Sequence, residues 1–88
     1  INMPQISMFY GIVIYMYYND HAPPHFHAIY GEYEALIQIL PFEVLRGNLP
    51  KRAMLLVKEW VEQNVSNLMK NWRHIENAEP LEKIPPLE

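Results

Sequence analysis

The run at residues 9–18, FYGIVIYMYY, constrains the fold of this chain more than any other stretch. Its β-branched and aromatic side chains favour a β-strand on a pleated, packed surface. Side chains alternate along a strand, so one face of this run is apolar and the other is rich in tyrosine. These faces consist of Ile12, Ile14, Met16 and Tyr18 on one side and of Val13, Tyr15 and Tyr17 on the other. We expect the first face to meet a core and the second to meet another element or a partner.

The residues that follow predict the remainder of a sheet. Pro23 and Pro24 break the first strand, because a proline has no N–H to donate to a neighbouring strand. Gly31-Glu32 fits a two-residue hairpin turn between two further strands. The later strands are expected at residues 25–30, 33–39 and, as a short edge strand, 43–46.

From Pro50 onward the pattern becomes helical. Proline suits the first position of a helix, and apolar residues recur mostly at steps of three and four over residues 51–77. The stretch at residues 64–67 has poor helix propensity, so we expect a kink or break there. Trp60 and Trp72 lie about 120° apart on an unbroken helix, which would leave at most one of them central to the core.

Strands followed by a helix predict an α+β domain. We expect an antiparallel sheet of three to four strands packed by a long C-terminal helix, in a single domain over residues 3–88. Residues 79–88 contain three prolines and are expected to form an extended tail that packs along the body or wraps a partner. Ile1 and Asn2 precede the first Met and are treated as a remnant of cloning or of an upstream start.

Composition narrows the class of protein. The chain has no cysteine, which excludes disulfides and thiolate metal sites and fits a reducing cytoplasm. No apolar run is long enough to cross a bilayer, so we expect a soluble, cytoplasmic protein without a membrane partner. The formal net charge of -3 argues against broad nucleic-acid binding, although a local basic patch remains compatible with it.

The segment HAPPHFHA, residues 21–28, concentrates the chemistry of the chain. Strand alternation places His25 and His27 on one face, where both imidazoles can reach one metal ion. His21, returned by the Pro-Pro corner, is a candidate third ligand. Asp20 is a candidate fourth ligand or the carboxylate that fixes a histidine tautomer. Such a site suits Zn²⁺, Ni²⁺, Cu²⁺ or Fe²⁺, and the sequence does not choose among them.

Two other interpretations of the histidines stay open. His21, His25 and His27 can stabilise a turn by hydrogen bonding, or they can act as catalytic acid and base in a reaction such as RNA cleavage. RNA cleavage needs a phosphate anchor, and the following basic residues flank the predicted helix start, where free N–H groups also favour an anion. The candidates are Arg46, Lys51 and Arg52. A solvated charged edge is the ordinary role of such residues.

The string MPQISMFYGIVIYMYYNDHAPPHFHAIYGEYEA, the later LPKRA, the helix with Trp60 and Trp72, and the ending EPLEKIPPLE together resemble a bacterial and archaeal family known as domain of unknown function 4160. The resemblance spans Met3 to Glu88. It implies a single-domain protein often encoded beside another small protein, an arrangement that looks like a toxin–antitoxin module. It brings no biochemical activity with it.

We therefore expect an interaction or regulatory module of a two-gene, toxin–antitoxin-like system, with the histidine cluster as its functional surface. Its partners would be the small protein of the neighbouring gene or a second copy of the chain. This hypothesis is non-enzymatic. The alternatives are a small RNA-cleaving hydrolase that uses histidine acid–base chemistry, and a metal-binding module without catalysis.

Overall fold

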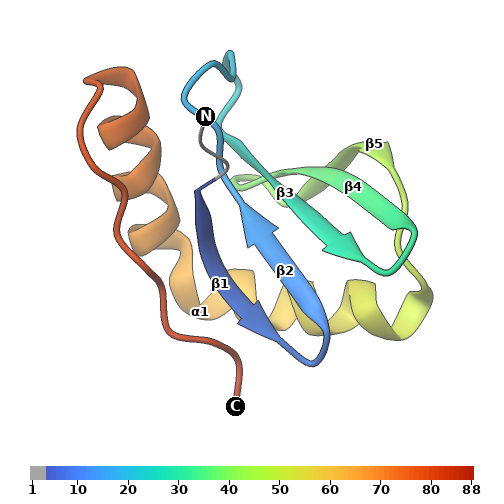
Figure 1. Ribbon diagram of the computed structural model, residues 1–88. Coiled ribbons are helices and arrows are strands. Elements are labelled where there is room, and N and C mark those ends of the chain that lie inside the picture. The colour runs from blue at the N-terminus through green and yellow to red at the C-terminus, as the bar shows by residue number, and fades with distance from the viewer. Residues whose placement is uncertain (1–3) are drawn as a thin grey trace.

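Five antiparallel strands and one long helix build the fold, in a computed structural model that describes residues 4–88 (Figure 1). The strands follow one another across the sheet in the order of the chain. The elements are β1 (Gln5–Phe9), β2 (Ile12–Tyr15), β3 (His25–Tyr30), β4 (Tyr33–Gln38), β5 (Glu43–Gly47) and α1 (Lys51–Glu76). The α+β class is confirmed, with five strands where three to four were expected.

The difference in strand number comes from a turn at Tyr10-Gly11. Both residues have positive φ, 50° and 82°, and Phe9 pairs directly with Ile12 across the turn. Glycine adopts a positive φ at little cost, so the chain can turn at Gly11. The run at residues 9–18 is therefore split between β1 and β2. The prediction of one continuous strand there is wrong. Its apolar face is correct for Ile12, Ile14 and Met16, which are fully buried, whereas Tyr18 is exposed.

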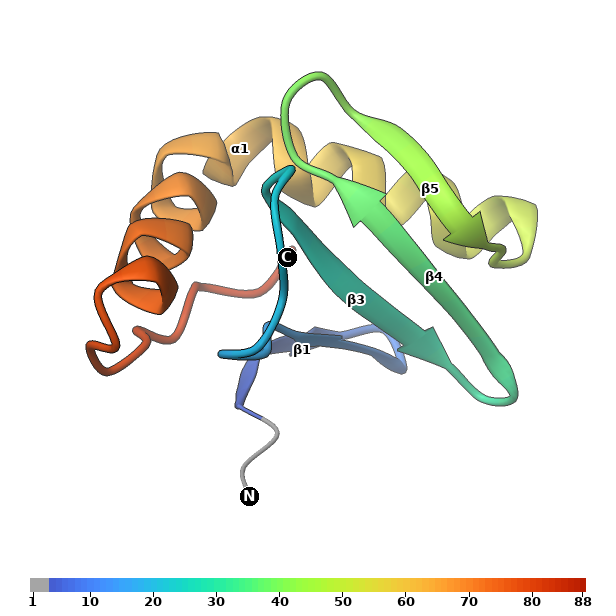
Figure 2. The ribbon, with the colours of Figure 1, turned by 90° about the horizontal axis from the view of Figure 1, so that it is seen from above.

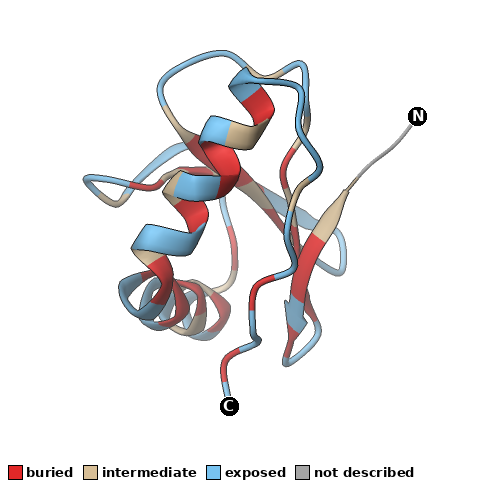
Figure 3. Cartoon of the chain, turned by 90° about the vertical axis from the view of Figure 1, so that its left-hand side faces the viewer, coloured by how far each residue is buried: buried red, intermediate tan, exposed pale blue. Residues whose placement is uncertain are grey.

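The core lies between the sheet and α1, which crosses one face of the sheet (Figures 1 and 2). Figure 3 shows buried and exposed residues alternating around the helix, as its apolar periodicity predicts. The largest buried side chains come from both layers and include Ile12, Ile14, Phe26, Ile37, Val57, Trp60 and Leu68. No helix in the described part of the chain is long and apolar enough to span a membrane.

The helix bends at Asn64, inside the stretch where a kink was expected. Asn64 has φ -133° and ψ 23°, and its side-chain amide donates a hydrogen bond to the backbone carbonyl of Trp60. The bend turns the second half of α1 toward one side of the sheet (Figures 1 and 2). Trp60 and Trp72 are therefore both buried, at 0% and 3% exposure. The expectation that only one could be central is wrong because it assumed an unbent helix.

The tail packs along the body rather than extending away from it. The Ile84 amide donates to the carbonyl of Ile6 in β1, and the indole N–H of Trp60 donates to the carbonyl of Pro85. Asn71 of α1 also exchanges two hydrogen bonds with the backbone of Glu82. The tail thus bridges the edge strand and the helix.

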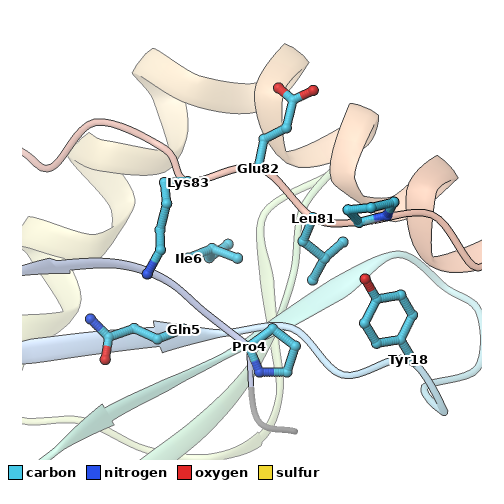
Figure 4. Close-up of a pocket in the computed structure, with 8 residues that line it drawn as sticks. Pro4, Gln5, Ile6, Tyr18, Leu81, Glu82 and Lys83 are labelled. Atoms are coloured by element: carbon cyan, nitrogen blue, oxygen red, sulfur yellow. The ribbon is translucent and has the colours of Figure 1, made fainter.

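A hollow of about 480 Å³ remains between β1 and this tail (Figure 4). Pro4, Gln5 and Ile6 line one side, and Leu81, Glu82 and Lys83 line the other. Tyr18 closes one end, and its hydroxyl donates a hydrogen bond to the carbonyl of Glu79. The tail is therefore held at both ends of the hollow.

Replacing Ile84 with alanine is expected to destabilise the protein by about 2–5 kcal/mol, because it removes a side chain that is only 4% exposed and leaves a cavity under the tail. Urea denaturation followed by circular dichroism measures the change. The matched control is Lys83→Ala, an exposed neighbour expected to change stability by less than about 0.5 kcal/mol. Equal stability of Ile84→Ala and wild type would show that the tail does not contribute to the core.

Candidate metal centre

The loop between β2 and β3 returns Asp20 to the first residues of β3. His25 and His27 stand two residues apart in a strand with regular pairing to β4, so their side chains share a face of the sheet. Asp20 Oδ2 lies 3.2 Å from His25 Nε2 and 3.0 Å from His27 Nε2. One ligand atom from each of the three residues falls within 4.8 Å of the others. The chain thus brings two imidazoles and one carboxylate to a single point.

The opposite nitrogen of each ring is also engaged. His25 Nδ1 lies 2.8 Å from the carbonyl oxygen of Pro23, and His27 Nδ1 lies 3.3 Å from Glu34 Oε2. The Pro23 carbonyl can only accept, so His25 Nδ1 carries a proton and donates, which leaves Nε2 as the free nitrogen of a neutral His25 ring. Both nitrogens of His27 face carboxylates, Glu34 at Nδ1 and Asp20 at the shorter Nε2 contact of 3.0 Å, so its neutral ring can donate to either.

The tautomer of His25 makes the cluster electrostatically incomplete. In a neutral His25 ring the Nε2 lone pair faces Asp20 Oδ2 at 3.2 Å, and these two electron-rich atoms repel each other. A proton on His25 Nε2 removes this repulsion, and so does one cation bound by His25, His27 and Asp20 together. An imidazolium at His25 would place a charge on a residue that is only 6% exposed. A single divalent cation satisfies the same atoms without charging either ring.

Aromatic neighbours restrict the motion of both rings. Trp72, from the second half of α1, packs against His25 at a centroid distance of 5.4 Å. Tyr17 meets His27 edge to face at 4.4 Å. Burial raises the pKa of Tyr17 above its ordinary value of 10.0, and the nearby Glu34, Tyr15 and Asp20 raise it further. Its phenol is therefore neutral at physiological pH and acts as a packing surface.

His21 is not part of the three-residue group. Its side chain is exposed and lines an open hollow of about 540 Å³ together with Asp20 and Glu76. Asp20 is therefore reached from solvent through a space that His21 borders. His74 is distant in sequence, and its Nδ1 lies 2.8 Å from Glu79 Oε1 in a separate contact.

The three candidate anion-binding residues are separated by the fold. Arg46 of β5 lines a hollow with His27 and Glu34. Arg52 instead lines a cavity with Tyr30, at the far end of β3 from His25, and Lys51 precedes it at the start of α1. Arg46 is thus the basic residue of the three that lies beside the histidines.

The sequence analysis did not assign Glu34, Tyr17 or Trp72 to the site. Glu34 could have been found from the hairpin, since the Gly31-Glu32 turn pairs Tyr30 with Tyr33 and places Glu34 on the face of His27. The contact of Trp72 with His25 joins residues from opposite halves of the chain. No local pattern predicts that contact.

Comparison with known proteins gives a family and nothing beyond it. A family model described as Domain of unknown function (DUF4160) matches residues 11–73, a span that includes all three residues of the cluster. No curated protein and no solved structure matches the chain.

The ring tautomers are directly measurable. We expect long-range ¹H–¹⁵N spectra at pH 7.5, with a chelator present, to show a protonated Nδ1 in His25, because the Pro23 carbonyl only accepts. The exposed His21 serves as the reference ring without this restraint. A signal typical of unprotonated Nδ1 in His25 would contradict the geometry described above.

Proposed function

The chain belongs to the DUF4160 family, whose description states no activity, and we propose that it is a small metal-binding protein that holds one divalent transition-metal ion through Asp20, His25 and His27. The observation that carries this proposal is the convergence of two Nε2 atoms on one carboxylate oxygen, while each Nδ1 lies beside a carbonyl or carboxylate oxygen. Histidines that ligate a metal have this same arrangement, with the second nitrogen bound to a carbonyl or carboxylate.

The spacing of the ligand atoms supports the proposal. Zn²⁺ binds histidine nitrogen and carboxylate oxygen at about 2.0–2.2 Å, so in a tetrahedral site neighbouring ligand atoms are about 3.3 Å apart. Asp20 Oδ2 lies 3.2 Å and 3.0 Å from the two imidazole nitrogens. These two contacts match that spacing, and the two nitrogens lie within 4.8 Å of each other.

Three protein ligands leave at least one coordination position for an exogenous group. Closed zinc sites use four protein ligands, whereas three ligands with an open position are typical of catalytic centres, and two histidines with one carboxylate also suit non-haem Fe²⁺. The open hollow beside Asp20 and His21 gives solvent access to the cluster of Asp20, His25 and His27. A bound ion would polarise a ligand or water at that position.

The other expected roles stay predictions. These are an interaction with the product of a neighbouring gene, self-association, and RNA cleavage by His21, His25 and His27. A metal centre is compatible with the first two, because a bound ion can stabilise a surface that contacts a partner. RNA cleavage by free histidines is the competing use of the same rings, since an imidazole that ligates a metal cannot exchange that nitrogen's proton.

Untagged protein is expected to bind one Zn²⁺ per chain in isothermal titration calorimetry and elemental analysis. At a free Zn²⁺ concentration one hundred times Kd, binding to the native state adds about 2.7 kcal/mol of stability, which raises Tm by about 10 °C or more for a domain of this size. A chelator should reverse that shift. Absence of stoichiometric Zn²⁺, Co²⁺ or Fe²⁺ binding would refute the proposal.

Substitutions distinguish the proposed ligand residues from a neighbouring histidine that is not expected to bind the ion. We expect Asp20→Asn, which preserves shape and removes the charge, to weaken Zn²⁺ binding at least tenfold, and the double substitution His25→Ala/His27→Ala to abolish it. The control is His21→Ala, which removes an exposed histidine beside the cluster and should change the affinity less than twofold. A larger loss in His21→Ala than in Asp20→Asn would reassign the ligand set.

A further inference from the structure

A second cavity, independent of the histidines, lies where two hairpin turns meet the start of α1. Its volume is about 240 Å³. Buried Ile12 and Ala53 contribute to its wall, Tyr10 comes from the turn between β1 and β2, and Tyr30 ends β3 beside the next turn. The remaining lining residues are Pro50, Arg52 and Leu56. The space is thus bounded by aliphatic side chains, two phenols and one cation.

The backbone fixes the aromatic part of this wall. Tyr10 is held at φ 50°, a conformation that non-glycine residues rarely adopt, and Gly11 follows at φ 82°. A Cβ on Gly11 would lie 3.3 Å from Cε1 of Tyr30, so the ring of Tyr30 packs over the glycine. The two tyrosines are therefore positioned by one turn whose sequence leaves room for both.

Arg52 gives the cavity its charge. It is exposed, and among residues 4–88 it forms no ion pair. Within the described part of the chain, no acidic residue lines the cavity or occupies the first turn of α1. A guanidinium binds a carboxylate in a bidentate manner, and aromatic walls favour a planar apolar ligand.

We propose that this cavity binds a small aromatic carboxylate, with its ring between Tyr10, Tyr30 and Leu56 and its carboxylate on Arg52. The volume is below the roughly 300–1,000 Å³ of sites for drug-sized ligands, which limits the occupant to a small ring system. The aliphatic wall takes the ring, and the single cation selects an acid over a neutral analogue. The site is separate from the metal centre, since Tyr30 ends the strand that His25 begins.

The test is an NMR titration of the full chain with indole-3-carboxylate and with its neutral isostere, indole-3-carboxamide. We expect saturable shifts of the amides of Tyr10, Gly11, Tyr30, Ala53 and Leu56 with the acid. The carboxamide should bind about tenfold more weakly or worse, because it loses a charge-assisted hydrogen bond.

Two adjacent basic residues provide matched variants. Arg52→Gln should lower the affinity for the acid to that for the carboxamide, whereas Lys51→Gln, which removes an exposed charge outside the cavity lining, should change it less than twofold. The proposal is overturned by equal affinities for acid and amide, by equal losses in the two variants, by shifts centred on other residues, or by no saturable shift up to the solubility limit.

Discussion

The contact of one carboxylate oxygen with two imidazoles constrains the end of the sheet at which β3 begins. Asp20 Oδ2 faces Nε2 of both His25 and His27, while oxygens of Pro23 and Glu34 lie beside the opposite nitrogens. A cation at the centre of this group would satisfy all three of its inner atoms. The Pro-Pro corner, the strand alternation and the packing of Trp72 all serve to hold these atoms together.

The scaffold holds this group through contacts that are far away in the chain. The bend at Asn64 carries the second half of α1 to the side of the sheet, where Trp72 covers His25. The tail then joins α1 to β1 through Asn71 and Ile84. A chain of 88 residues has a small core, so these additional contacts are a substantial part of what fixes the helix. The rigidity of the cluster depends on the whole domain.

Much of this arrangement could be predicted from local rules. The helix start directly after Pro50, the kink region, the Gly31-Glu32 turn and the shared face of His25 and His27 each depend on the geometry of a few neighbouring residues. The predictions that were wrong depended on one residue or one angle. Gly11 was assigned to a strand interior, although it forms a turn, and the unbent helix assumed for Trp60 and Trp72 ignored the bend between them.

The sequence alone determined the class of fold, the two histidines as a pair, and the identity of the chain as a member of its family, because periodicity and motif spacing are properties of neighbouring residues. Only the tertiary structure decided that Asp20 joins the pair, that His21 does not lie in the same group, and that Arg46 and Arg52 lie at different sites. Loop closure and the docking of α1 set these distances, and both depend on packing between residues that no local pattern relates.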